Sequence, residues 1–153
     1  MDVSLSFYTM LGFEFEPFVG GDFKGVDMTD VYGLGQPQTR MKFYHLRLPP
    51  VPQHVGYING AQGKEPVEPT RIDLVQWVEP KAHGKPLQDL TANGIARVSL
   101  HTTKIHEWHK HLKSQGVKFL NGDKGPASFG PDILILPFYD PDGVIIQLLQ
   151  GID

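Results

Sequence analysis

The stretch from Lys104 to Gly116, KIHEWHKHLKSQG, decides how the rest of the sequence is interpreted. Ile105, Trp108 and Leu112 recur in it at helical spacing, and Gly116 follows as a residue that ends a helix. An alternating segment precedes this helix, and three extended segments follow it, at residues 95–101, 117–120, 133–138 and 144–150. The second half of the chain therefore predicts the order strand, helix, strand, strand, strand.

The first half repeats this order without the opening strand. Apolar residues at helical spacing predict a helix over Ser4–Leu11, and Gly12 follows it as Gly116 follows the later helix. Strands are predicted at residues 12–16, 41–48 and 71–78, with a glycine-rich loop at 20–38 and an irregular segment at 51–70. Repetition of one unit within a chain is a strong indication of architecture.

The expected architecture is an α+β protein of two repeated βαβββ modules. The first module spans residues 1–80, a linker spans 81–93, and the second module spans 94–153. The opening strand of the first module is missing, so either the chain begins further upstream or another strand covers the exposed edge. Asp140-Pro141-Asp142-Gly143 predicts a tight turn before the last strand.

Composition excludes several classes of function. The 153 residues carry a formal net charge of −3, which gives no electrostatic attraction for nucleic acid or an anionic membrane. The chain has no cysteine, so it has no disulfides, no thiolate nucleophile and no cysteine-ligated metal. No apolar run is long enough for a membrane helix, and the N-terminus does not resemble a secretory signal. A cytoplasmic homodimer that binds a small molecule is expected.

Three segments resemble the vicinal oxygen chelate superfamily, which contains glyoxalases, bleomycin-resistance proteins and extradiol dioxygenases. SLSFYTMLGF at residues 4–13 looks like its first-helix signature, and RIDLVQW at 71–77 resembles the last strand of its first module. DPDG at 140–143, followed by IQL at 146–148, looks like its closing hairpin. The resemblance implies two βαβββ modules curled into an open barrel around a binding cavity.

The resemblance also implies positions for metal ligands, and these are poorly filled. Asp73 stands at the glutamate position of the first module, Arg97 at the histidine position of the second, and Gln147 at its glutamate position. Arg97 has no lone pair to give a metal ion, so the metal centre is expected to be lost and no cofactor is expected. Arg97 either binds a ligand or forms an ion pair with Asp73 that replaces the metal.

Strand alternation predicts which other side chains face the cavity. Asp73 brings Trp77 to its face, Arg97 brings Ser99 and His101, and the strand at 41–48 brings three further residues, Phe43, His45 and Arg47. Apolar walls with a few polar groups are typical of a small-molecule pocket. Tyr44, Leu46 and Leu48 are expected on the opposite, helix-covered face.

The histidines lead to different expectations. His106 and His109 are three residues apart and are expected to lie on a solvated helix face rather than in a metal site. His54 and His83 fall in predicted loops and are expected at the surface. Nearby arginines would favour the neutral ring of His45, so it is a candidate general base, and an ordinary cavity histidine is the alternative.

Two functions remain open. The first is a metal-independent isomerase, lyase or cyclase that moves a proton next to a carbonyl, with His45, Asp73 and Arg97 as catalytic residues and Arg47 holding an oxygen anion. The second is a bleomycin-resistance-type protein that sequesters an aromatic compound between Phe43 and Trp77. A metal-dependent glyoxalase or dioxygenase is disfavoured by Arg97 and Gln147.

Overall fold

A computed structural model of the chain describes residues 1–27, 29, 33, 38–49 and 70–151. It divides into two compact units, Met1–His83 and Gly84–Asp153, and the division falls inside the predicted linker. His54 and most of the segment predicted to be irregular lie outside the described residues. None of the described helices is long and apolar enough to cross a membrane.

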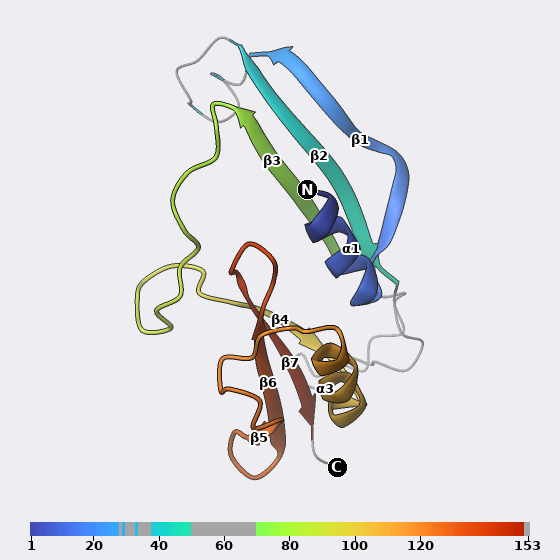
Figure 1. Ribbon diagram of the computed structural model, residues 1–153, viewed down its shortest axis with the longest axis vertical. Coiled ribbons are helices and arrows are strands. Elements are labelled where there is room, and N and C mark those ends of the chain that lie inside the picture. Colours follow the sequence, from blue (N-terminus) through green and yellow to red (C-terminus); the bar gives the residue numbers. More distant parts are fainter. Residues whose placement is uncertain (28, 30–32, 34–37, 50–69, 152–153) are drawn as a thin grey trace, which may run out of the picture. The chain divides into compact units, whose positions relative to one another are not determined.

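In its described part, the first unit contains the helix α1 and a three-stranded antiparallel sheet (Figure 1). Its elements are α1 (Asp2–Met10), β1 (Glu14–Val26), β2 (Thr39–Leu48) and β3 (Thr70–Glu79), and the strand order is β1-β2-β3. Gly12 has a φ of +96°, as the residue after a helix often does, so the predicted helix end is confirmed. A Cβ atom at Gly12 would lie 3.7 Å from Leu48, so the end of α1 lies against β2.

The loop predicted at residues 20–38 is wrong over its first part, because β1 runs on to Val26. Gly20 is opposite Tyr44 and Gly21 is opposite Phe43, after an irregularity in the ladder between Phe15 and Gly20. A Cβ atom at Gly20 would lie 2.5 Å from the carbonyl oxygen of Phe43. Glycine here lets two backbones approach closely in a bulged strand, and it leaves no side-chain pattern from which a strand is predicted.

We expect Gly20→Ala to destabilise the protein more than Gly21→Ala does. Both glycines have a positive φ, +142° and +145°, so both variants carry backbone strain. Only at Gly20 does the new methyl group meet backbone, whereas at Gly21 nothing lies within 4 Å. The extra loss in the free energy of unfolding should be about 1–3 kcal/mol, the usual cost of overpacking. Urea denaturation measures it, and equal losses in the two variants would contradict the bulge.

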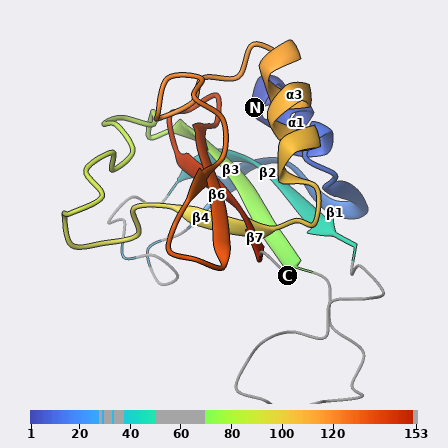
Figure 2. The ribbon, with the colours of Figure 1, turned by 90° about the horizontal axis from the view of Figure 1, so that it is seen from below.

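The second unit packs one helix on one face of a four-stranded mixed sheet (Figure 2). Its elements are β4 (Val98–His101), α3 (Ile105–Ser114), β5 (Ala127–Ser128), β6 (Ile133–Tyr139) and β7 (Ile145–Gly151), with strand order β4-β7-β6-β5. β4 runs parallel to β7, and the other pairs are antiparallel. This is the complete βαβββ order, and the predicted α+β fold with repeated modules is confirmed.

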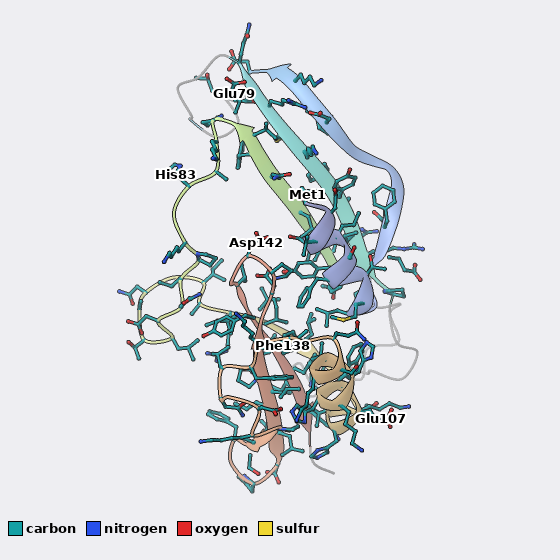
Figure 3. The ribbon with its side chains drawn as sticks, in the orientation of Figure 1. Met1, Glu79, His83, Glu107, Phe138 and Asp142 are labelled. Atoms are coloured by element: carbon teal, nitrogen blue, oxygen red, sulfur yellow. The ribbon has the colours of Figure 1, made fainter. Side chains whose placement is uncertain are left out.

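The core of the second unit comes from apolar residues of α3 and β6. Ile105 and Leu112, which the helical spacing singled out, are fully buried, and so is Leu136 of β6. Phe138 of β6, labelled in Figure 3, is also fully buried. Thr102 and Gln150 start the helix, because their side-chain oxygens accept the backbone N–H groups of Lys104 and Ile105 at 3.0 and 2.8 Å. Burying each such aliphatic side chain contributes about 1.5–3 kcal/mol.

Strand boundaries differ from expectation at both ends of this unit. Ile95 is 88% exposed and precedes β4, because pairing with β7 begins only at Val98. The strand predicted at residues 117–120 is reduced to one bridge between Phe119 and Phe138. β5 lies between the segments predicted as strands at 117–120 and 133–138. The turn at Asp140 is confirmed, since its Oδ1 accepts the N–H groups of Asp142 and Val144 at 3.0 and 2.7 Å.

The predicted solvated histidine face of α3 is wrong for His109. Its side chain is only 18% exposed, and its ring stands 5.0 Å from that of Phe119. Its Nε2 lies 3.3 Å from Asp123 Oδ1, and Lys113 Nζ lies 2.7 Å from the other oxygen. The loop after α3 folds back onto the helix, which periodicity within the helix alone does not reveal.

We expect Asp123→Asn to destabilise the second unit slightly and only above about pH 4. The hydrogen bond from Lys113 is the main reason that the pKa of Asp123 lies below its usual 3.8. A lowered folded-state pKa means that the stabilisation is complete above the unfolded value and disappears as the pH falls through the folded one. Thermal unfolding of the wild-type protein and of Asp123→Asn between pH 3 and 7 measures the difference in stability. A stability difference that persists at pH 3 would contradict the role assigned to the Asp123 carboxylate.

Candidate functional site

One face of the first sheet carries a cluster of charged and imidazole side chains together with apolar ones. In the register of β2 on β3, Phe43 is opposite Val75, His45 is opposite Asp73, and Arg47 is opposite Arg71. Residues directly opposite in an antiparallel pair point to the same side, so these six side chains share one face. Leu46 and its partner Ile72 alternate with them and belong to the other face, where Leu46 is fully buried.

His45 lies between two carboxylates. Its Nδ1 is 2.9 Å from Asp73 Oδ1, and its Nε2 is 3.4 Å from Glu16 Oε2. The side chains of His45 and Glu16 are about one-fifth exposed, at 21% and 22%, whereas that of Asp73 is half-exposed. The cluster is therefore sheltered but reachable from solvent.

The two arginines of this face are paired with glutamates of β1. Arg47 Nη2 lies 3.1 Å from Glu14 Oε2, and Arg71 Nε lies 3.7 Å from Glu16 Oε1. Their positive charges are thus partly balanced, and the immediate neighbours of the His45 ring are acidic. The expectation that arginines set the charge state of His45 is not supported by these contacts.

Apolar side chains border the polar cluster on one side. The ring of Phe43 lies 6.3 Å from that of His45 and 6.4 Å from that of Phe23. Val75 and Phe23 are 44% and 39% exposed. A partly exposed apolar border beside an imidazole and two carboxylates is the combination that small-molecule sites use for binding and orientation.

The arrangement can carry out proton transfer. A carboxylate that accepts a hydrogen bond from Nδ1–H holds the ring in one tautomer, and the lone pair then lies on Nε2. Glu16 faces that nitrogen, so a proton can pass between the two groups or to a molecule bound beside them. When both nitrogens are protonated, both donate to carboxylates and the imidazolium is stabilised.

Trp77, another predicted site residue, lies on β3 opposite Met41. The remaining predicted site residues belong to the second unit. Ser99 is opposite Gln147 and His101 is opposite Leu149, so these four share one face of that sheet. Gln147 is buried, while Ser99 and His101 are exposed. Arg97 is exposed and lies one residue before β4. The Asp73–Arg97 pair joins residues of two different units and stays a prediction.

Glu16 is the residue that sequence reasoning missed. The alternation Phe13-Glu14-Phe15-Glu16 was available as a signal, because it places both glutamates on the face away from buried Phe13. The residue of the neighbouring strand that these glutamates contact depends on the register, which cannot be predicted from the alternation. A shallow groove lies elsewhere, on α3, and it is lined by Lys104, Glu107, Trp108 and His111.

The metal centre implied by the family does not fit the residues at its positions. Asp73 already accepts from His45, Arg97 has no lone pair, and Gln147 offers only a neutral amide. Within residues 1–27, 29, 33, 38–49 and 70–151, no three His, Cys, Asp or Glu side chains are grouped so as to hold a metal ion. Metal independence stays a prediction.

Comparison with known proteins agrees with the fold. The family described as Glyoxalase/Bleomycin resistance protein/Dioxygenase superfamily matches residues 1–148. A glyoxalase family protein from Bacillus cereus has a similar structure, with a TM-score of 0.74 and 18% identity over 100% of this chain and 87% of that one. A glyoxylase/bleomycin resistance protein/dioxygenase domain from Frankia sp. EAN1pec has a TM-score of 0.59 and 19% identity, over 99% and 88%. No curated protein sequence matches the chain.

The fold thus defines an α+β protein of paired βαβββ modules. The chain belongs to the glyoxalase/bleomycin resistance/dioxygenase superfamily, and the resemblance seen in the sequence is confirmed.

We expect Asp73→Asn to change the tautomer of the neutral His45 ring. The 2.9 Å contact favours the proton on Nδ1, and an asparagine can instead donate to that nitrogen. Because Asp73 is half-exposed, the effect should be about 1 kcal/mol, or about fivefold in the tautomer ratio. Nitrogen-15 NMR of the histidine rings measures the ratio. Asp123→Asn, which removes the carboxylate near His109, is the matched control and should leave the His45 signals unchanged.

Proposed function

We propose that this protein is an isomerase or lyase that transfers a proton at a carbon next to a carbonyl group, with His45 as the base. The observation that carries the proposal is the position of the His45 ring, with Asp73 at 2.9 Å from Nδ1 and Glu16 at 3.4 Å from Nε2. We further propose that the enzyme works without a metal or another cofactor, as a homodimer in the cytoplasm, and without nucleic acid or membrane partners.

Each group of the cluster has a role in this reaction. Asp73 accepts the Nδ1–H bond and leaves the Nε2 lone pair available. Nε2 takes the proton from the substrate carbon, and the electron pair of the broken C–H bond moves into the enolate. The resulting imidazolium is stabilised between Asp73 and Glu16. Return of the proton to a neighbouring atom completes an isomerisation, whereas loss of a leaving group completes an elimination.

The border of the cluster supports a small, partly apolar substrate. Phe43 and Val75 lie on the same face as His45 and form an apolar surface on which the substrate would rest. Arg47 is engaged by Glu14 at 3.1 Å, so it is a weaker candidate for holding an anion than the sequence suggested. Arg97 remains the residue that we propose for a carboxylate or enolate oxygen.

Deuterium exchange at carbon tests the proposal. A panel of small carbonyl compounds, neutral and carboxylated, is incubated in heavy water with the wild-type protein, and exchange is followed by proton NMR. We expect exchange with at least one compound, and we expect His45→Gln to slow it by about 10²–10⁴-fold, the usual contribution of a general base. Asp73→Asn should slow it less, and Arg97→Leu should slow it for carboxylated compounds only.

The control is His106→Gln, which replaces an exposed histidine of α3. If a panel compound binds with ordinary affinity and yet shows no deuterium exchange with either the wild-type protein or His45→Gln, the result contradicts the proposed enzymatic function. That result favours the second candidate, a sequestering protein whose aromatic side chains Phe43 and Trp77 contact the ligand.

A further inference from the structure

Each of the three asparagines of the chain is followed by glycine. They are Asn59, Asn93 and Asn121, and the structure describes the last two. In such a pair the backbone nitrogen of the glycine can approach the side-chain amide of the asparagine, because glycine has no Cβ atom to hinder it and its backbone adopts conformations that other residues avoid. The two described pairs have different surroundings in the folded chain.

The Asn121–Gly122 pair is held by hydrogen bonds at both of the positions that would react. Asn121 Nδ2 donates to the backbone carbonyl of Gly125 at 2.8 Å, and Asn121 Oδ1 is buried. The backbone N–H of Gly122 donates to the carbonyl of Phe119 at 3.3 Å. Attack of this nitrogen on the side chain would break both hydrogen bonds, so the fold opposes the reaction at Asn121.

The Asn93–Gly94 pair has neither of these restraints. Both residues are exposed, and they lie in the irregular segment that leads to β4. Within the described part of the chain, the Asn93 side chain makes no hydrogen bond, and the backbone N–H of Gly94 has no acceptor. Gly94 has a φ of +133°, in the region that favours glycine. The attacking nitrogen and the amide carbon are therefore both unrestrained and in contact with water.

From this contrast we propose that Asn93 is a site of spontaneous deamidation and that the fold protects Asn121. The backbone nitrogen of Gly94 attacks Cγ of Asn93 and forms a new C–N bond. The Cγ–Nδ2 bond breaks, and ammonia leaves with the proton that the backbone nitrogen loses. Water then adds to either carbonyl of the resulting cyclic imide and opens the ring. The products are aspartate and isoaspartate at position 93, and the reaction needs only water.

The products change the chain just before it enters the second sheet. Either product adds one negative charge, four residues before Arg97. Isoaspartate also carries the backbone through the former side chain, so it lengthens the chain by one carbon atom. Because β4 begins at Val98, this extra length falls in the connecting segment and leaves the strand pairs in place. An effect on a ligand at Arg97 rests on the proposed function, whereas the modification itself does not.

Peptide mass spectrometry of aged protein tests the site. Freshly purified wild-type protein is incubated at mildly alkaline pH, which favours the deprotonated attacking nitrogen, and samples taken over several weeks are digested briefly with trypsin. The three asparagines fall in different tryptic peptides, 48–64, 82–97 and 119–124, because trypsin does not cut before Pro86. We expect peptide 82–97 to convert at least about tenfold faster than peptide 119–124, since two hydrogen bonds must break at Asn121.

The same protein incubated in urea is the matched control. Both described asparagines are followed by glycine, so they differ mainly in the contacts that the fold gives them. Unfolding removes these contacts, and the ratio of the two rates should fall towards one. Equal rates in the folded protein would overturn the proposal. A ratio that persists unchanged in urea would also overturn it, because local sequence and not the fold would then be the cause.

Two variants test the chemistry at position 93. Asn93→Gln lengthens the side chain by one methylene group, so the same attack would have to close a larger ring, and peptide 82–97 should stay unmodified. If this peptide still converts in Asn93→Gln, the modification lies at Gln88, the other amide of the peptide, and the proposed site is wrong. Asn93→Asp supplies the aspartate form as a chromatographic standard, against which isoaspartate is recognised. These measurements read peptide mass and not turnover, so they succeed or fail independently of the proposed reaction.

Discussion

The antiparallel register between β2 and β3 is the constraint on which the first unit depends. It places His45 opposite Asp73 and, one position along, Leu46 opposite Ile72. A shift of one residue would bring His45 to the buried face and leave Leu46 exposed. The burial of Leu46 thus holds the polar cluster in place, since the same pairing that removes Leu46 from water assembles His45 with its carboxylates.

The described sheets of the two units differ in their number of strands, three in the first and four in the second. In the second unit, α3 buries Ile105 and Leu112 against a sheet in which β7 has neighbours on both sides. Among the described residues of the first unit, the corresponding strand β3 pairs with β2, and none of its ten residues is buried.

The polar cluster also shows how one fold can hold different side chains at equivalent positions. Asp73 stands where the family resemblance implies a metal-binding glutamate, and its Oδ1 lies 2.9 Å from Nδ1 of a histidine on the neighbouring strand. Family membership establishes the fold, whereas the chemistry that a site can perform depends on its own side chains.

The sequence by itself determined the elements and their order, because helical spacing, alternation and glycine at helix ends are local signals. It also determined which strand residues share a face, since alternation has a fixed period. Only the tertiary structure decided that β1 continues through Gly20, that Glu16 meets His45, and that His109 is covered by the loop after α3. Each of these depends on contacts between residues far apart in the chain, and such contacts follow from register and loop path rather than from local pattern.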